Sequence, residues 1–415
     1  MQQYKRELER RFIKMVENVS VILHWNTDYA EFPRSEFPTV VQTSFEPMVS
    51  AIEDWKDGKI CFNITGHTFE YLQKNNPELL DRIKVLVKDD IVEMIASGYS
   101  HPILPLLPRP RVETQLKDHI ALLKKLFKKT PIGIWPPELA VSPSVLSQIK
   151  KQGIKWTAID YEHFLLSQYF GNDMNPFERR DLSATEILVD AYWTKGLKKL
   201  RAYLKALRTI KEVQKTQDQP VQRVIINDKE TIKAFLCSVS WTYSTQFAVG
   251  GDIAFYNMKK HLKAINNSNS KHLNIYGSDI EFFGYRSMGP EAAKPVDLIN
   301  FLRILKKQGI NTKSPSDIPE EEWPKEASYL SAGCWSPDKS FRIWTDSEDN
   351  TEFIRRANEI YDILSRLGWK KDLMTKLEPY LRIMENSDPR GWAPIPERKN
   401  EAYSAMASIF EILEK

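Results

Sequence analysis

Two acidic side chains stand in settings that suit acid–base or nucleophilic chemistry. Glu138 lies in GIWPPELAVSP (133–143), directly after two prolines that fix the backbone before it. Asp279 lies in IYGSDIEFFGY (275–285), after an apolar run and between two glycines. Cleavage of a glycosidic bond needs one carboxylate as nucleophile and one carboxyl that still holds its proton. The structural alternatives are an exposed residue in the first turn of the next helix for Glu138, and a helix cap for Asp279.

Histidine and tryptophan side chains in nearby motifs suit sugar binding. SGYSHPILPLLPRP (97–110) carries four prolines among leucines and can continue neither a helix nor a strand. We expect a rigid wall with His101 at its start, where the imidazole could bind a sugar hydroxyl; a purely structural histidine is the alternative. Flat aromatic faces suit sugar rings, and Trp135 and Trp335 lie in motif segments, Trp335 in the loop-like SAGCWSPDKS.

Short apolar runs alternate with longer helical patterns along the first 280 residues. The runs predicted as strands cover residues 19–23, 59–64, 90–96, 132–135, 155–159, 223–226 or 234–239, and 273–276. Continuously hydrophobic strands joined by helices indicate a parallel sheet covered on both faces. Seven such units favour an α/β fold of the (β/α)7 barrel type over a doubly wound sheet.

Polar residues follow these runs, at the places where a β/α barrel builds its active site. They are His24, Asn26, His67, His101, Glu138, Asp160, Glu162, Asp279 and Glu281. Each alone is more often an ordinary loop residue. Their convergence on one rim predicts a functional site at the carboxyl ends of the strands.

Two stretches do not show the alternation of strands and helices that predicts the barrel. We expect a catalytic barrel over residues 1–290, with a charged helical insertion around 164–222. Beyond it, amphipathic patterns at 298–308, 352–367, 371–385 and 400–415 predict helices. The region 291–415 is therefore predicted to be an α-helical bundle that packs against the barrel and completes the substrate cleft.

Composition excludes several other functions. The formal charge of +4 results from 59 basic and 55 acidic residues without a concentrated basic stripe, so we expect no nucleic-acid partner. A charged N-terminal stretch, three cysteines and no long apolar run predict a cytoplasmic protein without a membrane anchor. No two histidines are spaced one helical turn apart and no glycine-rich phosphate loop occurs, so we expect neither a metal nor another cofactor. The sequence indicates no particular oligomeric state.

Five segments together resemble the sequence regions of glycoside hydrolase family 57. They lie in this order between about residues 20 and 350: LHWNTDYAEFP, VEMIASGYSHPILPLL, GIWPPELAVS, IYGSDIEFFGY and SAGCWSPDKSFRIW. The family contains α-amylases, 4-α-glucanotransferases, branching enzymes, amylopullulanases and α-galactosidases, on a (β/α)7 barrel with a helical C-terminal region. The resemblance implies the same fold here.

The resemblance also implies roles for individual residues. By position, Glu138 is similar to the family's nucleophile and Asp279 to its acid/base. Glu93 matches an inward glutamate expected to organise the floor of the site at the same rim. His24 matches the histidine of the first region, and Trp335 matches a late aromatic residue that stacks on sugar.

One segment departs from the family pattern. The first region usually reads His-Gln-Pro, whereas this chain has His24-Trp25-Asn26. We expect the changed residues to line the sugar site nearest the scissile bond and to affect which sugar is bound. The prediction is a retaining glycoside hydrolase or transglycosylase acting on α-linked glucans. An α-galactosidase of the same family and a non-catalytic sugar-binding or regulatory barrel are the alternatives.

Overall fold

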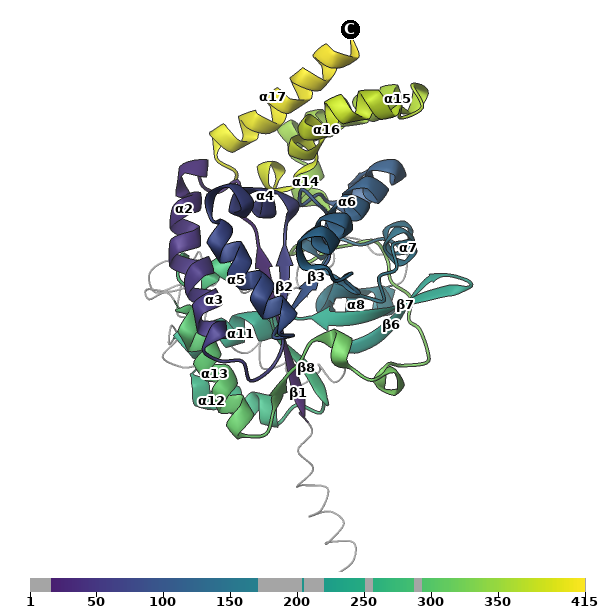
Figure 1. Ribbon diagram of the computed structural model, residues 1–415. Coiled ribbons are helices and arrows are strands. Elements are labelled where there is room, and N and C mark those ends of the chain that lie inside the picture. Colours follow the sequence, from purple (N-terminus) through teal and green to yellow (C-terminus); the bar gives the residue numbers. More distant parts are fainter. Residues whose placement is uncertain (1–15, 171–203, 205–219, 251–256, 287–292, 415) are drawn as a thin grey trace, which may run out of the picture.

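The computed structural model describes residues 16–170, 204, 220–250, 257–286 and 293–414 (Figure 1). The strands in these residues are β1 (Asn18–Trp25), β2 (Ile60–Ile64), β3 (Val92–Ile95), β4 (Gly133–Ile134), β5 (Trp156–Asp160), β6 (Val221–Asn227), β7 (Glu230–Cys237), β8 (His272–Asp279) and β9 (Asn311–Thr312). Most of the helical insertion predicted at 164–222 lies outside the described residues.

The helices of the barrel part precede those of the C-terminal part along the chain. The first group comprises α2 (Phe37–Val40), α3 (Glu46–Glu53), α4 (Gly66–Asn75), α5 (Pro77–Lys88), α6 (Arg109–Phe127), α7 (Pro143–Lys151), α8 (Tyr161–Phe170), α11 (Val239–Gly250), α12 (Met258–Asn266) and α13 (Pro295–Lys307). The second comprises α14 (Arg342–Thr345), α15 (Glu348–Arg366), α16 (Lys371–Glu385) and α17 (Pro396–Leu413). The four helices predicted beyond residue 290 correspond to α13, α15, α16 and α17.

Seven strands run parallel in the spatial order β8-β1-β2-β3-β4-β5-β7. The join between β3 and β4 is short: the N–H of Ala96 donates to the carbonyl of Gly133 at 2.8 Å, and the N–H of Trp135 donates to Ala96 at 2.9 Å. Within the described residues no ladder joins β7 to β8. The predicted (β/α)7 architecture is therefore present as a barrel with one seam not closed by strand pairing.

The sixth position of the barrel is taken by β7. Its last four residues, Ala234 to Cys237, are buried, and it pairs parallel with β5. β6 pairs antiparallel with β7 through a tight turn, in which the N–H of Lys229 donates to the side chain of Asn227 at 2.9 Å. Both alternatives for the sixth run are thus strands, but only the second belongs to the parallel set, and Val239 already begins α11.

Burial explains why these runs form central strands. Every residue of β1 and β2 is buried, as a sheet covered on both faces requires. Side chains that point outward, such as Leu23 and Phe62, pack with apolar residues of α3, α5 and α13. Side chains that point inward, such as Ile22, Cys61 and Phe235, fill the barrel interior. This packed interior forms a floor for whatever lies at the strand ends.

The helices α15, α16 and α17 lie together at one end of the barrel (Figure 1). Leu377, Leu381 and Ile409 are part of their separate apolar core. Helix α13 and the short β9, in contrast, lie beyond residue 290 and pack against the barrel, with β9 paired to β1. The division at residue 290 stays a prediction. Among the described helices, none combines the length and apolar character needed to cross a bilayer.

Candidate active site

A cavity of about 480 Å³ lies at the carboxyl ends of the barrel strands, where residues 388–393 of the C-terminal part complete its wall. Residues that follow β1, β4 and β8 contribute most of its polar groups. Six of its lining side chains are aromatic: Tyr29, Trp135, Tyr243, Phe282, Trp335 and Trp392. A concave site with aromatic walls and a few converging polar groups is the usual form of a small-molecule site.

Glu138 enters this cavity from a contorted turn after β4. The backbone of Glu138 has φ of +57° and that of Leu139 +49°, a region that residues other than glycine seldom occupy. The side chain is only 13% exposed. The indole Nε1–H of Trp335 donates to Glu138 Oε2, and the N–H of Trp335 donates to the carbonyl of Glu138 at 3.2 Å. An exposed position in the first turn of α7 is therefore excluded for Glu138.

Asp279 is the last residue of β8 and lines the same cavity. It lies level with His24 of β1, and its Oδ2 is 3.3 Å from Nη2 of Arg286. Its side chain makes no capping hydrogen bond to the following turn, so the helix-cap interpretation is wrong. The neighbouring Glu281 is fully buried, pairs with Arg286 at 2.7 Å and does not line the cavity.

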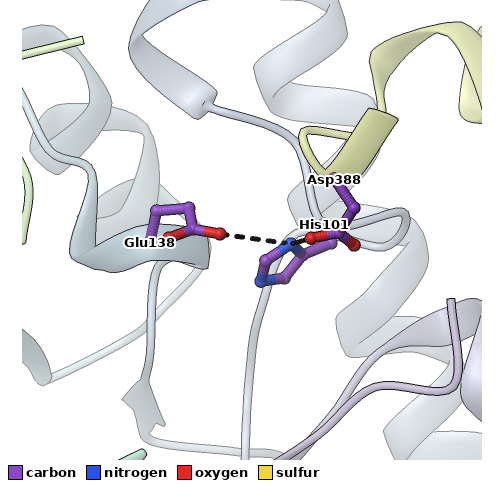
Figure 2. A group of neighbouring side chains, drawn as sticks. All are labelled: His101, Glu138 and Asp388. Carbon is purple, nitrogen blue, oxygen red and sulfur yellow. Dashed lines mark ion pairs between the residues drawn. The ribbon is translucent and has the colours of Figure 1, made fainter. Parts of the chain in front are cut away.

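His101 lies between two carboxyl groups, Glu138 from the barrel and Asp388 from the C-terminal part (Figure 2). Its Nδ1 is 3.9 Å from Glu138 Oε1, 3.6 Å from Asp388 Oδ1 and 3.0 Å from Ser387 Oγ. The second oxygen of Asp388 accepts a hydrogen bond from the side chain of Asn26 at 2.9 Å. Like Glu138, His101 has a positive φ, of 58°.

These three side chains could also hold a metal ion. One donor atom each from His101, Glu138 and Asp388 lies within 4.8 Å of the others. Imidazole and carboxylate are ligands that Zn²⁺ accepts. Each carboxyl keeps one oxygen turned to His101, while the other is held by Trp335 or by Asn26.

His24 and Trp135 also line the cavity. His24 is buried with Nδ1 2.7 Å from Asn63 Oδ1, and Nε2 has no hydrogen-bond partner among the described residues. Its ring centre is 4.9 Å from that of His101. Trp135 packs over Gly277 of β8, where a side-chain carbon would come within 3.1 Å of the indole. Both residues are therefore available to a ligand.

Glu93 does not join this group. It is the second residue of β3 and lies level with Cys61 and Ile22, two residues before the level of His24. Successive residues of a strand rise about 3.3 Å, so this places Glu93 well below the rim. Its carboxylate accepts a hydrogen bond from Ser316 Oγ at 2.5 Å and does not line the cavity. The expectation that Glu93 lies at the same rim is wrong.

The residues of the first region that differ from the family pattern do not line the sugar site, contrary to expectation. Trp25 is completely buried and packs between Phe45 and Phe62 in the outer core. Asn26 is buried beneath Asp388, to which it donates. Neither residue lines the cavity. The changed residues therefore reach the site only indirectly, through the position of Asp388.

Burial dominates the electrostatics of the cavity. It raises the pKa of Glu138 to about 8, an effect that Asp279 and Glu31 strengthen and the Trp335 hydrogen bond opposes. Burial also raises the pKa of Asp388 well above its usual range and lowers that of His101 well below it. Near neutral pH these shifts favour a protonated Glu138 and a neutral His101 imidazole.

Three prominent lining residues were not predicted from the sequence. Asp388 and Trp392 belong to SDPRGW (387–392), a turn between two amphipathic helices that carries no strand signal. Trp392 is 41% exposed, and its ring centre is 5.3 Å from that of Trp335. Arg286 follows Asp279 by seven positions, and its guanidinium packs over the ring of Tyr29. The positions of these three residues follow no helix or strand period that starts from the motifs, so the sequence pattern could not identify them.

Comparison with known proteins identifies related chains. The sequence model of glycosyl hydrolase family 57 matches residues 2–331. An α-amylase from Pyrococcus abyssi is 29% identical over 140 residues, 32% of this chain and 21% of the relative. A 4-α-glucanotransferase from Thermococcus litoralis is 25% identical over 132 residues, 31% of this chain and 19% of the relative. The alignments thus span about a fifth of these relatives.

Solved structures share the fold over nearly the whole chain. The 4-α-glucanotransferase from Thermococcus litoralis superposes with a TM-score of 0.69 at 14% identity, covering 96% of this chain and 60% of that one. A family 57 branching enzyme from Thermococcus kodakaraensis, solved with glucose, gives a TM-score of 0.65 at 15% identity, covering 95% and 90%. These likenesses confirm the fold, including the C-terminal helices.

Proposed function

Because the chain belongs to glycosyl hydrolase family 57, we propose that it is a retaining glycoside hydrolase or transglycosylase acting on α-linked glucans. Glu138 is the nucleophile and Asp279 the acid/base. The observation that carries this proposal is the shared cavity: two carboxyl groups, 141 positions apart in the sequence, face one space with aromatic walls. The α-amylase and 4-α-glucanotransferase named above support α-glucan as the substrate class.

The reaction follows a double displacement. Asp279 gives its proton to the leaving oxygen while Glu138 Oε1 attacks the anomeric carbon, and the covalent glycosyl-enzyme forms. Asp279 then takes a proton from water or from a sugar hydroxyl, which attacks the same carbon and releases Glu138. Water gives hydrolysis and a sugar hydroxyl gives transfer.

The side chains around the pair have supporting roles in this proposal. Trp335 holds one oxygen of Glu138 and offers a face to the sugar, with Trp392 extending the surface outward. His101 and Asp388, on the other side of Glu138, are placed to bind hydroxyl groups of the sugar next to the scissile bond. Three buried thiols without a disulfide support a reducing compartment, and we propose the cytoplasm.

A trapping experiment tests the assignment of roles. The protein is incubated with a 5-fluoro-α-glucosyl fluoride, which forms a glycosyl-enzyme that hydrolyses slowly, and the labelled peptide is identified by mass spectrometry. We expect the label on Glu138 and none in Glu138→Gln. A label on Asp279 would reverse the two roles.

Product analysis tests the substrate class and separates the alternatives. Maltooligosaccharides should give longer products by transfer or shorter ones by hydrolysis, with retained anomeric configuration by NMR. Turnover of an α-galactoside in place of maltooligosaccharides would favour the α-galactosidase alternative. Binding of maltooligosaccharides without any turnover would favour a sugar-binding barrel.

A further inference from the structure

Two acidic residues at the end of β5, Asp160 and Glu162, do not line the cavity, although their positions resemble those of catalytic residues. Asp160 is fully buried and Glu162 nearly so, and neither lines the cavity. Both face the ammonium of Lys339, whose Nζ lies 3.1 Å from Asp160 Oδ1 and 3.1 Å from Glu162 Oε2. Asp160 is itself fixed, because its Oδ1 accepts the N–H of His163 at 2.7 Å.

Lys339 is a fully buried lysine on the loop that carries Trp335. Its Nζ also donates to the main-chain carbonyl of Trp335 at 3.1 Å. Its N–H donates to the carbonyl of Ser336 at 2.9 Å, and its own carbonyl accepts from the N–H of Cys334 at 3.4 Å. The loop is thus closed around Trp335, with the ammonium joining it to the end of β5.

Trp335 in turn is tied to Glu138 by two hydrogen bonds, one from its indole and one from its main chain. Gly333 of the same loop exchanges two main-chain hydrogen bonds with Val141, at 2.9 and 3.0 Å. A continuous set of contacts therefore runs from β5 through Lys339 and Trp335 to the turn after β4. Lys339 does not line the cavity, so it cannot touch the sugar.

We infer that Lys339 is a positioning residue for Glu138, acting through the loop of Trp335, and that Asp160 and Glu162 are there to hold its charge. The inference rests on the proposed role of Glu138. A buried ion pair seldom adds net stability over apolar packing, but its directed contacts can fix one geometry. Burial raises the pKa of Asp160 and the nearby Lys339 ammonium opposes this rise, so the ammonium favours the charged carboxylate.

The test separates positioning from general loss of fold. Lys339→Met alone would leave Asp160 buried without its cation, so the main variant is Lys339→Met with Asp160→Asn. It removes the ammonium and the fully buried carboxylate and leaves Glu162, whose side chain is 12% exposed. Trp335→Phe removes the indole N–H together with the five-membered ring, and keeps a smaller aromatic face at the cavity. Lys399→Met is the control for loss of a lysine charge as such, because it breaks an exposed lysine–aspartate pair, with Asp349, outside the cavity.

The first readout is kinetic. We expect the double variant to lose on the order of 100-fold in kcat, as misplacement of a reacting group by about 1 Å does, with a smaller change in KM. Trp335→Phe should lose a comparable factor in kcat. Adding Trp335→Phe to the double variant should lower kcat little further, because both changes act on the same contact between Trp335 and Glu138. Lys399→Met should retain wild-type kcat.

The second readout does not depend on activity. Titration of Glu138 is followed by ¹³C NMR of labelled glutamate carboxyls, with the signal assigned by its loss in Glu138→Gln. The titratable groups that interact with Glu138 are Asp279, Glu31, Asp388, His101 and Cys334, and the Trp335 N–H donates to it. None of these five titratable groups is changed. Losing the indole hydrogen bond should move the midpoint upward by roughly one pH unit in both variants.

Two outcomes would overturn the inference: an unchanged Glu138 midpoint in the folded double variant, or fully additive kinetic losses. A wild-type protein without glycosidase activity would instead reject the proposed function. The titration would still show whether Lys339 positions Glu138.

Discussion

A carboxyl group that attacks a sugar must be ionised, and the surroundings of Glu138 oppose ionisation. Burial raises its pKa to about 8. If Glu138 is the nucleophile, kcat/KM for maltooligosaccharides should rise with pH through about 8, because this profile reports the free enzyme. Steady-state rates over a pH series check this. A rise in kcat/KM centred near the ordinary glutamate pKa of about 4.3 would contradict this prediction.

The same carboxyl should reduce the stability of the fold as the pH rises. The pKa of Glu138 is raised from 4.5 to about 8 on folding. The stability that this carboxyl contributes is therefore fully present below the pKa of the group in the unfolded state. It is lost as the pH rises through about 8, the pKa in the folded state. The side chain at position 138 stays neutral at every pH in Glu138→Gln. At alkaline pH the free energy of unfolding of this variant should therefore exceed that of the wild type by roughly 2–4 kcal/mol at most. Urea unfolding at acidic and alkaline pH measures the difference, which should be near zero at the acidic end.

Trp392 should act on binding more than on chemistry. It is partly exposed at the cavity and packs near Trp335 rather than against Glu138 or Asp279. Trp392→Ala should raise KM for maltooligosaccharides by roughly 5–10-fold, equivalent to about 1–1.5 kcal/mol of lost aromatic contact, with kcat little changed. Substrates of increasing length check this. A loss of kcat with unchanged KM would place Trp392 in the catalytic step.

At the level of elements, helix α16 is joined to the barrel by a buried arginine. Arg111 of α6 contacts Glu378 and Glu385 of α16, each at 2.6 Å. Arg111→Met should destabilise the fold by about 3–5 kcal/mol, because it leaves buried carboxylates without their cation. Arg355→Met, which breaks exposed pairs on α15, should cost less than about 1 kcal/mol. Thermal unfolding compares the two, and equal losses would contradict the role of Arg111.

Most elements were predictable because their burial follows simple periods. The parallel strands are continuously apolar, and α13, α15 and α16 show apolar stripes that end at the predicted residues within a turn. The direction of β6 was not predictable, since residues 223–226 and 234–239 have similar composition. Only the tight turn at Lys229 makes β6 an antiparallel partner. β9, with two residues, is too short for any periodic signal.

At the level of the whole molecule, the sequence indicated the barrel half of the site better than the other half. His24 and Asp279 lie at the ends of strands and His101 and Glu138 follow strands, and parallel strands bring their carboxyl ends together. Glu93 was misplaced because a four-residue strand gives no sign of how far along it the rim lies. Asp388 comes from a turn 362 positions after its partner Asn26, and no local pattern reports such a contact.

The turn between α16 and α17 has a consequence for how such proteins could diversify. Residues 388–393 supply Asp388 and Trp392 to the cavity, while the helices on either side are held by a core of their own. In the proposed function the barrel strands supply the reacting groups. Substitutions at Asp388 and Trp392 should therefore alter which sugar is accepted while Glu138 and Asp279 stay unchanged. Directed evolution of these two positions would explore new specificities, while the buried Pro389 and Arg390 between them keep the turn in place.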